Sequence, residues 1–119
     1  MIVLLAAGLV GGVGAIARFL LDGAVSRRAG RAFPFGTLAV NLSGAFGLGV
    51  LAGAALSDTA YRVAGTGLIG AFTTFSTWAL ESHRLAEDGR APLGALNFAA
   101  SLVLGVALAW AGRRLGAAL

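Results

Sequence analysis

The stretch that decides the fold is Gly65–Trp78, with the sequence GTGLIGAFTTFSTW. It is apolar enough to lie within a membrane, yet its three glycines and its Thr-Thr pair weaken a helix more than any other stretch of the chain. We therefore predict that the helix is broken near Gly70 to Thr73. A break in lipid leaves backbone groups unpaired, which is tolerated only where they are buried in protein, line a cavity or bind an ion. A continuous glycine-rich helix, whose Ser and Thr hydroxyls bond to carbonyls one turn earlier, is the alternative that the composition leaves open.

This stretch lies in the third of four apolar runs along a chain of 119 residues. Hydrophobic residues make up 58% of the chain, which also has 19 glycines, and only 12% of its residues are charged. Ordinary soluble domains are roughly 45–50% apolar even with glycine included, so the composition excludes a soluble catalytic domain. Because a membrane span needs about 20 apolar residues, we expect transmembrane helices over about residues 2–21, 35–56, 60–81 and 93–112. The predicted fold is an all-α membrane protein, with one four-helix transmembrane domain over residues 1–119 and a break in the third helix.

The charged and reactive residues argue against metal, nucleic-acid and hydrolytic chemistry. The chain has no cysteine and one histidine, which excludes disulfide scaffolds and thiolate metal sites and makes a zinc site a poor hypothesis. Its nine basic residues are arginines that lie mainly at the ends of apolar runs, where they meet lipid headgroups, so we expect no nucleic-acid partner. Ser76 and His83 are seven residues apart, with no second histidine and no nucleophile-elbow pattern. We therefore expect that the protein is not an enzyme.

Short connections between the four runs make consecutive helices run up and down, which leaves both termini on one side of the membrane. The end that holds the first and third connections carries five arginines and the other end three, namely Arg27, Arg28, Arg31, Arg84 and Arg90 against Arg62, Arg113 and Arg114. Under the positive-inside rule this difference is small, so the chain is free to insert in both orientations. Small residues four apart, such as Gly49 and Gly53, allow close helix packing. Four short helices leave little interior for a pathway, so we also expect self-association.

Two side chains are polar or charged where a span should be apolar. Asn41 is the one strongly polar side chain in the second run. Its amide has two donor protons and a carbonyl, so it could hold an anion or bond a neighbouring helix. Arg18, near the end of the first run, could anchor the helix in the lipid interface or form an electropositive vestibule that concentrates anions. The residues alone leave both alternatives open.

Two further sets share a helix face. Phe75 and Trp78 are three residues apart, and such aromatic pairs usually pack, although the positive edge of a ring can also meet an anion. In the fourth run, Asn97, Ser101 and Gly105 follow one another at four-residue steps. That face could present hydrogen-bond donors beside a close-packing notch, or it could be an ordinary polar seam between helices.

Together these segments resemble the Fluc/CrcB family of fluoride channels. The matching pieces are GGVGAIAR at 11–18, GTLAVNLSG at 36–44 and GAFTTFST at 70–77, followed by Glu81 three positions beyond Trp78. Their order and spacing cover all four predicted helices. The resemblance implies a fluoride-selective channel of the cell membrane, the plasma or inner membrane of a bacterium, that exports fluoride passively and so reduces its toxicity in the cytoplasm. It also implies a homodimer of two oppositely inserted copies, with two fluoride pathways along the interface.

The resemblance implies a role for individual residues. The fluoride pathway would be lined by Asn41, Phe75, Trp78, Ser101, Thr74 and Arg18. Asn41 would donate a hydrogen bond to fluoride, Phe75 would offer its ring edge, and Ser101 its hydroxyl. Arg18 would form an electropositive mouth, while Glu81 would have the structural task of fixing the end of the third helix.

The resemblance also implies one cofactor, a structural Na⁺ on the two-fold axis of the dimer. Backbone carbonyls of Gly70 and Thr73 would hold it, and the two-fold would double the few oxygens that one chain offers. The chain departs from the family at two positions. Trp78 stands where a phenylalanine is common, and Asn97 where a tyrosine often stands, so the roles of these two residues do not transfer directly.

Two other functions fit a chain of this size. A small dual-topology multidrug/proton exporter would need a membrane-embedded carboxylate in its first helix, and no acidic residue precedes Asp22. A membrane scaffold that transports nothing would use its polar residues only to join helices. The fluoride channel, with fluoride, the lipid bilayer and a second copy as partners, is the prediction.

Overall fold

The computed structural model describes residues 1–119 and is built from helices alone. The elements are α1 (Ile2–Ala29), α2 (Phe35–Gly53), α3 (Asp58–Tyr61), the π-helical segment η1 (Arg62–Ile69), α4 (Gly70–Phe72), α5 (Ser76–Glu87) and α6 (Ala91–Ala118). Four stretches are long and apolar enough to cross a membrane, and the third of them, Asp58–Glu87, is the one composed of several segments. The structure thus confirms the predicted all-α membrane fold with an interrupted third helix.

The helix ends differ from those expected. α1 continues to Ala29 instead of ending near residue 21, and α6 covers Ala91–Ala118 rather than about 93–112. The predicted ends mark where apolar residues stop, whereas backbone hydrogen bonds continue into polar residues that water and headgroups can solvate. α1 ends at Gly30, whose φ of 79° an L side chain rarely adopts, and whose N–H donates to the carbonyl of Ser26. α2 is shorter than predicted and ends at Gly53 rather than near residue 56.

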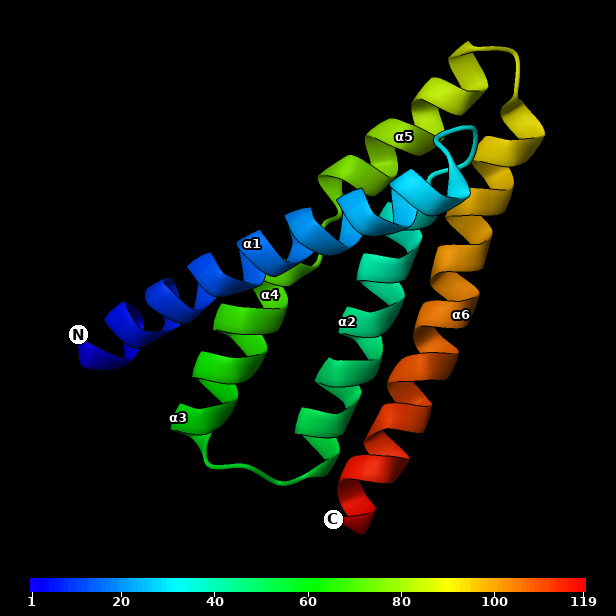
Figure 1. The fold of residues 1–119 in the computed structure, drawn as a ribbon. Helices are drawn as coiled ribbons and strands as arrows, with labels where there is room; N and C mark the ends of the chain where they lie inside the picture. Colours follow the sequence, from blue (N-terminus) through cyan, green and yellow to red (C-terminus); the bar gives the residue numbers. More distant parts are fainter.

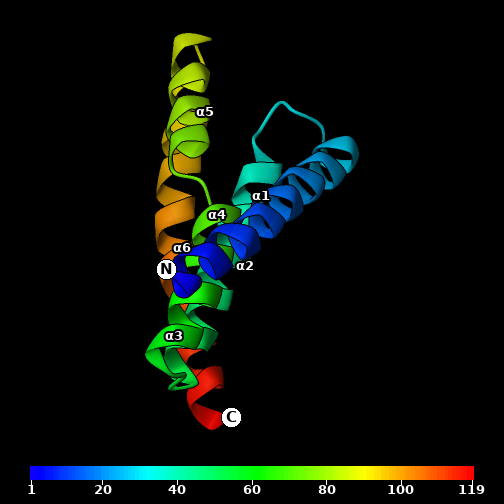
Figure 2. The ribbon, with the colours of Figure 1, turned by 90° about the vertical axis from the view of Figure 1, so that its left-hand side faces the viewer.

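The four spans run up and down, as Figure 1 shows. The connections at residues 30–34 and 88–90 lie at one end of the molecule, and the connection at 54–57 lies at the other end together with the C-terminus. α2 and α6 run parallel and side by side, while α5 packs against the first part of α6. α1 crosses the third span at η1 and α4, and its C-terminal part lies against the start of α2, where a Cβ added at Gly36 would collide with Asp22, while it diverges from α5 and α6 (Figure 2).

Glycines bring α2 and α6 into backbone contact. A Cβ added at Gly49 or Gly53 of α2 would collide with a carbonyl oxygen of α6, and one added at Gly112 or Gly116 of α6 would collide with a carbonyl oxygen of α2. Each helix thus carries two glycines four residues apart that face the other helix. The predicted packing role of Gly49 and Gly53 is confirmed.

The chain buries little of itself. Only 15 of its 119 residues are buried, and most large apolar side chains of α1 and α6 are exposed. Exposed apolar surface of this extent requires an apolar environment, either lipid or another protein surface. The fold therefore fits a membrane protein in which few residues are buried between the helices of one chain.

Candidate site at the break of the third helix

The third span is interrupted between α4 and α5. α4 ends at Phe72, Thr73 has extended backbone angles (φ −80°, ψ 160°), and α5 begins at Ser76. The break therefore starts at Thr73, the last residue of the predicted interval. The Thr-Thr pair lies at the break as predicted, whereas the effect expected of the glycines is wrong, because the glycines that precede the break stay helical.

These glycines serve packing instead. Gly65 and Gly67 are buried, and a Cβ added at Gly67 would lie 2.8 Å from the carbonyl oxygen of Ala7 on α1. The Gly70 N–H donates to the carbonyls of Gly65 and Gly67, so the wide π-helical turn continues up to α4. Glycine at position 67 allows α1 to approach η1 closely, whereas Gly65 faces Leu48 of α2 and the Tyr61 ring.

Asn41 of α2 stabilises the break by pairing with both backbone groups of Thr74, its N–H and its carbonyl. Its Nδ2 donates to the Thr74 carbonyl at 2.8 Å, and its Oδ1 accepts from the Thr74 N–H at 2.8 Å. In a continuous α-helix that N–H would donate to the carbonyl of Gly70. Asn41 therefore bonds a neighbouring helix, and one proton of its Nδ2 is left over from this pairing.

Thr74 starts the next helix. Its Oγ1 accepts from the N–H of Thr77 at 3.3 Å, which is the bond of a helix N-cap, and its hydroxyl donates to Thr77 Oγ1 at 3.2 Å. A continuous helix would instead pair the Thr77 N–H with the carbonyl of Thr73. The carbonyls of Gly70 and Thr73 both lose their α-helical donors to side-chain oxygens.

The aromatic side chains that follow the break are in contact. The rings of Phe75 and Trp78 meet edge to face, with centroids 5.2 Å apart and an angle of 73°. Phe75 is 73% exposed, whereas Trp78 is 6% exposed and stacks on Phe98 of α6 at 4.5 Å. The structure thus brings the two predicted aromatic residues together, and it adds Phe98, which sequence reasoning missed.

Two cavities adjoin the break on different sides. The larger, of about 530 Å³, is lined in part by Asn41, Thr74, Phe75 and Trp78, and also by Gly70 and Thr73. The second, of about 220 Å³, reaches from Arg18 of α1 to Thr74 and Thr77, and includes Asp22 and Thr37.

Ser101 lines neither cavity. It lies on α6, and its Oγ is buried without a hydrogen-bond partner.

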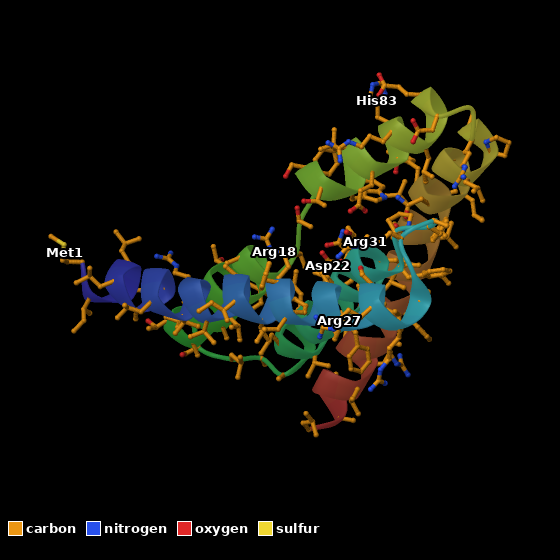
Figure 3. All side chains as sticks on the ribbon, turned by 45° about the horizontal axis from the view of Figure 1, so that its top comes forward. Met1, Arg18, Asp22, Arg27, Arg31 and His83 are labelled. Carbon is orange, nitrogen blue, oxygen red and sulfur yellow. The ribbon has the colours of Figure 1, made fainter.

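Glu81 connects α5 to α2. Its Oε1 accepts from Thr37 Oγ1 at 3.1 Å, and its Oε2 is buried without a partner. A cavity of about 260 Å³ next to Glu81 is lined by Asp22 and Arg31 as well. Figure 3 shows Arg18, Asp22 and Arg31 on the side of α1 that faces α5, with Arg27 on the opposite side.

Residues 5–113 match the family model described as CrcB-like protein, Camphor Resistance (CrcB). The chain belongs to the CrcB family. Among its CrcB relatives, a protein of Mycolicibacterium paratuberculosis named Fluoride-specific ion channel FluC 2 is 55% identical over 107 residues, which cover 90% of this chain and 88% of the relative. Fluoride-specific ion channel FluC of Geobacter sulfurreducens is 47% identical over 117 residues, 94% of each chain. The predicted family is confirmed, and this CrcB protein is a multi-pass protein of the cell membrane.

Three partners in this CrcB site escaped sequence reasoning, namely Thr37, Ser82 and Phe98. Each contacts a residue that the sequence did single out: Thr37 bonds Glu81, Asn97 Nδ2 donates to Ser82 Oγ at 2.8 Å, and Phe98 stacks on Trp78. Polar residues inside apolar runs are costly unless they are paired. That cost was a usable signal for Thr37. Ser82 lies just beyond the third apolar run, among polar residues, and nothing in the local sequence distinguishes Phe98 from other apolar residues.

Proposed function

We propose that this protein is a fluoride-selective ion channel that lets fluoride leave the cell passively and so lowers its toxicity in the cytoplasm. The observation that carries the proposal is the 55% identity, over 90% of this chain, to a relative that is named a fluoride-specific ion channel. The four spans and the cavities at the break of the third one are consistent with it. The chain would act as a pathway for an ion, with no catalytic step.

The residues at the break suit fluoride chemically. Fluoride is small, strongly hydrated and a strong hydrogen-bond acceptor, so a pathway has to replace its water with several weak donors that do not trap it. Asn41 has one amide proton left after it pairs with Thr74, and it lines the same cavity as the exposed ring of Phe75. An aromatic ring carries positive potential at its edge. Asn41 and Phe75 would therefore be successive contacts of the ion.

Arg18, Thr74, Trp78 and Ser101 would complete the pathway. Arg18 lines the cavity on the other side of Thr74, where its positive charge would attract anions from solution. Thr74 and Trp78 line the larger cavity, and the buried hydroxyl of Ser101 has a proton that no group in the chain takes up. Glu81 would act structurally, by fixing α5 to α2 through Thr37.

The carbonyls of Gly70 and Thr73 would hold a structural Na⁺. Their α-helical donors, the N–H groups of Thr74 and Thr77, are bonded to side-chain oxygens instead. Neutral carbonyl oxygens are hard ligands that suit a cation such as Na⁺. When bound, the ion would offset the dipoles of these carbonyls and join the two chains that supply them.

A second, oppositely inserted copy would complete the site. One chain offers only two such carbonyls, and much of its apolar surface on α1 and α6 is exposed. A two-fold axis in the membrane plane through the break would double the oxygens and cover part of that surface. The homodimer would then contain two pathways, each related to the other by the axis.

Fluoride flux from liposomes tests the proposal. Purified protein is placed in vesicles loaded with potassium fluoride, valinomycin is added to release potassium, and a fluoride electrode records efflux. We expect fluoride efflux without any proton gradient. Vesicles loaded with potassium chloride and followed with a chloride electrode should show no chloride efflux. Drug-dependent proton exchange in place of fluoride efflux would indicate an exporter, and no flux of any kind would indicate a scaffold. Either result would overturn the proposal.

A further inference from the structure

Asn97 of α6 is the most deeply buried polar side chain, with 1% of its surface exposed. Its Nδ2 donates to Ser82 Oγ at 2.8 Å, and the Ser82 hydroxyl in turn donates to the Trp78 carbonyl at 2.9 Å. A serine hydroxyl has a single proton. Because Ser82 uses it for Trp78, it can only accept from Asn97, and this fixes the orientation of the Asn97 amide.

A second hydrogen bond, donated from α5 to α6, closes a ring of hydrogen bonds between these two helices. Trp78 Nε1 donates to the backbone carbonyl of Asn97 at 3.4 Å. Asn97 thus holds the backbone of Trp78 through Ser82, while its own backbone holds the indole. Gly94 makes this possible, because a Cβ there would lie 2.6 Å from the Ser82 carbonyl oxygen and would push α6 away from α5.

Direct binding of fluoride is a poor fit for Asn97. The one atom of its side chain without a partner is Oδ1, which is buried. A carbonyl oxygen is an acceptor and repels an anion. Nδ2 keeps one proton after it donates to Ser82, as Nδ2 of Asn41 does after its bond to Thr74, but Asn97 is 1% exposed and lines none of the three cavities described above. Asn97 therefore has the geometry of a group that acts through another residue.

We propose that Asn97 is the positioning residue for Trp78, and through it for Phe75, in the fluoride pathway. Trp78 lies between the Phe98 ring, which stacks on it, and the Phe75 ring, which meets it edge to face. The closed set of hydrogen bonds through Asn97 and Ser82 restricts both side-chain torsions of Trp78. Because Phe75 packs against the indole, this also fixes which edge of the Phe75 ring faces the larger cavity. The expected effect of Asn97 on fluoride flux rests on the proposed function. The expected effect of Asn97 on the position of Trp78 does not depend on it.

Two readouts test the proposal, fluoride efflux from liposomes and the fluorine NMR signal of Trp78. Trp110→Phe leaves Trp78 as the only tryptophan of the two in the chain, so incorporated 5-fluorotryptophan reports its position alone. In this background, we expect Asn97→Leu and Ser82→Ala each to shift or split the resonance. We expect each to slow efflux about tenfold, the size that the loss of one buried hydrogen bond gives.

Two variants separate positioning from loss of fold. Ser82→Thr keeps the hydroxyl, and it should restore both the resonance and the efflux rate. Ser43→Ala is the matched control, because the exposed Ser43 hydroxyl also bonds carbonyls of its own helix but makes no hydrogen bond to another helix. It should change neither readout. If Asn97→Leu does not fold, Ser82→Ala still decides the question.

The dependence on Trp78 is tested in a double-mutant cycle. If Asn97 acts through the indole, Asn97→Leu should have little further effect on efflux once Trp78 is replaced by Phe. Equal slowing in both backgrounds, or slowing with an unchanged Trp78 resonance, would overturn the proposal. If the parent protein conducts no fluoride, the proposed function fails, whereas an unchanged resonance in Asn97→Leu and Ser82→Ala shows separately that Trp78 is not positioned by this ring.

Discussion

At the scale of single residues, the Asn41 side chain substitutes for a backbone partner. Its side-chain amide bonds both the N–H and the carbonyl of Thr74, as the N–H and carbonyl of one residue on a neighbouring antiparallel strand would. The sequence indicated that Asn41 was unusual because it is polar in an apolar run, but it left open whether the amide bonds a helix or an anion. The helix bond is now established by the geometry. The contact with fluoride stays a prediction for the remaining proton.

Asn41→Asp tests this residue. A carboxylate can still accept from the Thr74 N–H, but it has no proton for the Thr74 carbonyl and it places negative charge beside the path of an anion. Two like charges about 4 Å apart repel each other by roughly 4 kcal/mol at an effective dielectric constant of about 20, which corresponds to roughly 1000-fold in rate, so we expect a loss of fluoride efflux of at least about 100-fold. Efflux from liposomes measures it, and size-exclusion chromatography checks that the variant is folded.

The control adds the same charge elsewhere. Thr59 is exposed in the first turn of α3, where a carboxylate is tolerated near the helix N-terminus. Thr59→Asp should therefore keep the parent efflux rate. Parent-like efflux in Asn41→Asp would remove Asn41 from the pathway.

At the scale of elements, sequence spacing identifies a helix face but not what covers it. Pairs of small residues four apart occur on several helices, and only the structure tells which of them contact another helix of the chain. Gly49 and Gly53 lie against α6, whereas an added Cβ at Gly8, Gly12 or Gly105 would meet no atom within 4 Å. The position of the break is likewise set by a distant residue. Asn41 is 33 positions from Thr74, and local helix propensity carries no information about that contact.

Gly112→Ala tests the contact between α2 and α6. Its added methyl group would collide with the Phe46 carbonyl, which is backbone and cannot move aside as a flexible side chain can. Overpacking of this kind costs about 1–3 kcal/mol. We therefore expect a lower midpoint of thermal unfolding in detergent, followed by the loss of helical circular dichroism.

Gly105→Ala is the matched control on the same helix. The added methyl group meets no atom of the chain within 4 Å, and alanine is about 0.8–1.0 kcal/mol better than glycine inside a helix. Its unfolding midpoint should stay the same or rise. Equal destabilisation by both substitutions would contradict the view that α2 and α6 are held by backbone contact at Gly112.

At the scale of the whole molecule, composition is sufficient for the membrane fold and insufficient for the assembly. Four spans follow from the apolar content and the length, because each span needs a fixed number of apolar residues. Which surfaces meet lipid and which meet a second copy does not follow, since both surfaces are apolar. With 15 of 119 residues buried, most of this apolar surface lies outside the chain's own packing. Labelling from one side of the membrane measures the orientation in which the chain is inserted.

Because the chain has no cysteine, a single one can be introduced at either end of the molecule and labelled from one side of the membrane. Leu119→Cys marks the C-terminal end, and Ala32→Cys marks the connection at the opposite end; both positions are exposed. In intact cells, a membrane-impermeant maleimide should label about half of the copies of each variant, because the small arginine difference between the two ends favours neither orientation strongly. Permeabilised cells should give complete labelling of both.

The two variants have to agree for the assembly to be antiparallel. Copies inserted one way only would label fully at one end and not at the other. A two-fold axis in the membrane plane would then be impossible, and the carbonyls of Gly70 and Thr73 could not be joined by the same carbonyls of an inverted copy. The proposed Na⁺ site would fail with it, whereas conduction by a single chain or a parallel pair would stay open to the liposome measurement. The measured insertion orientation of the copies thus distinguishes two alternatives. Either two inverted copies share an ion site at the break, or the break is stabilised within one chain by Asn41.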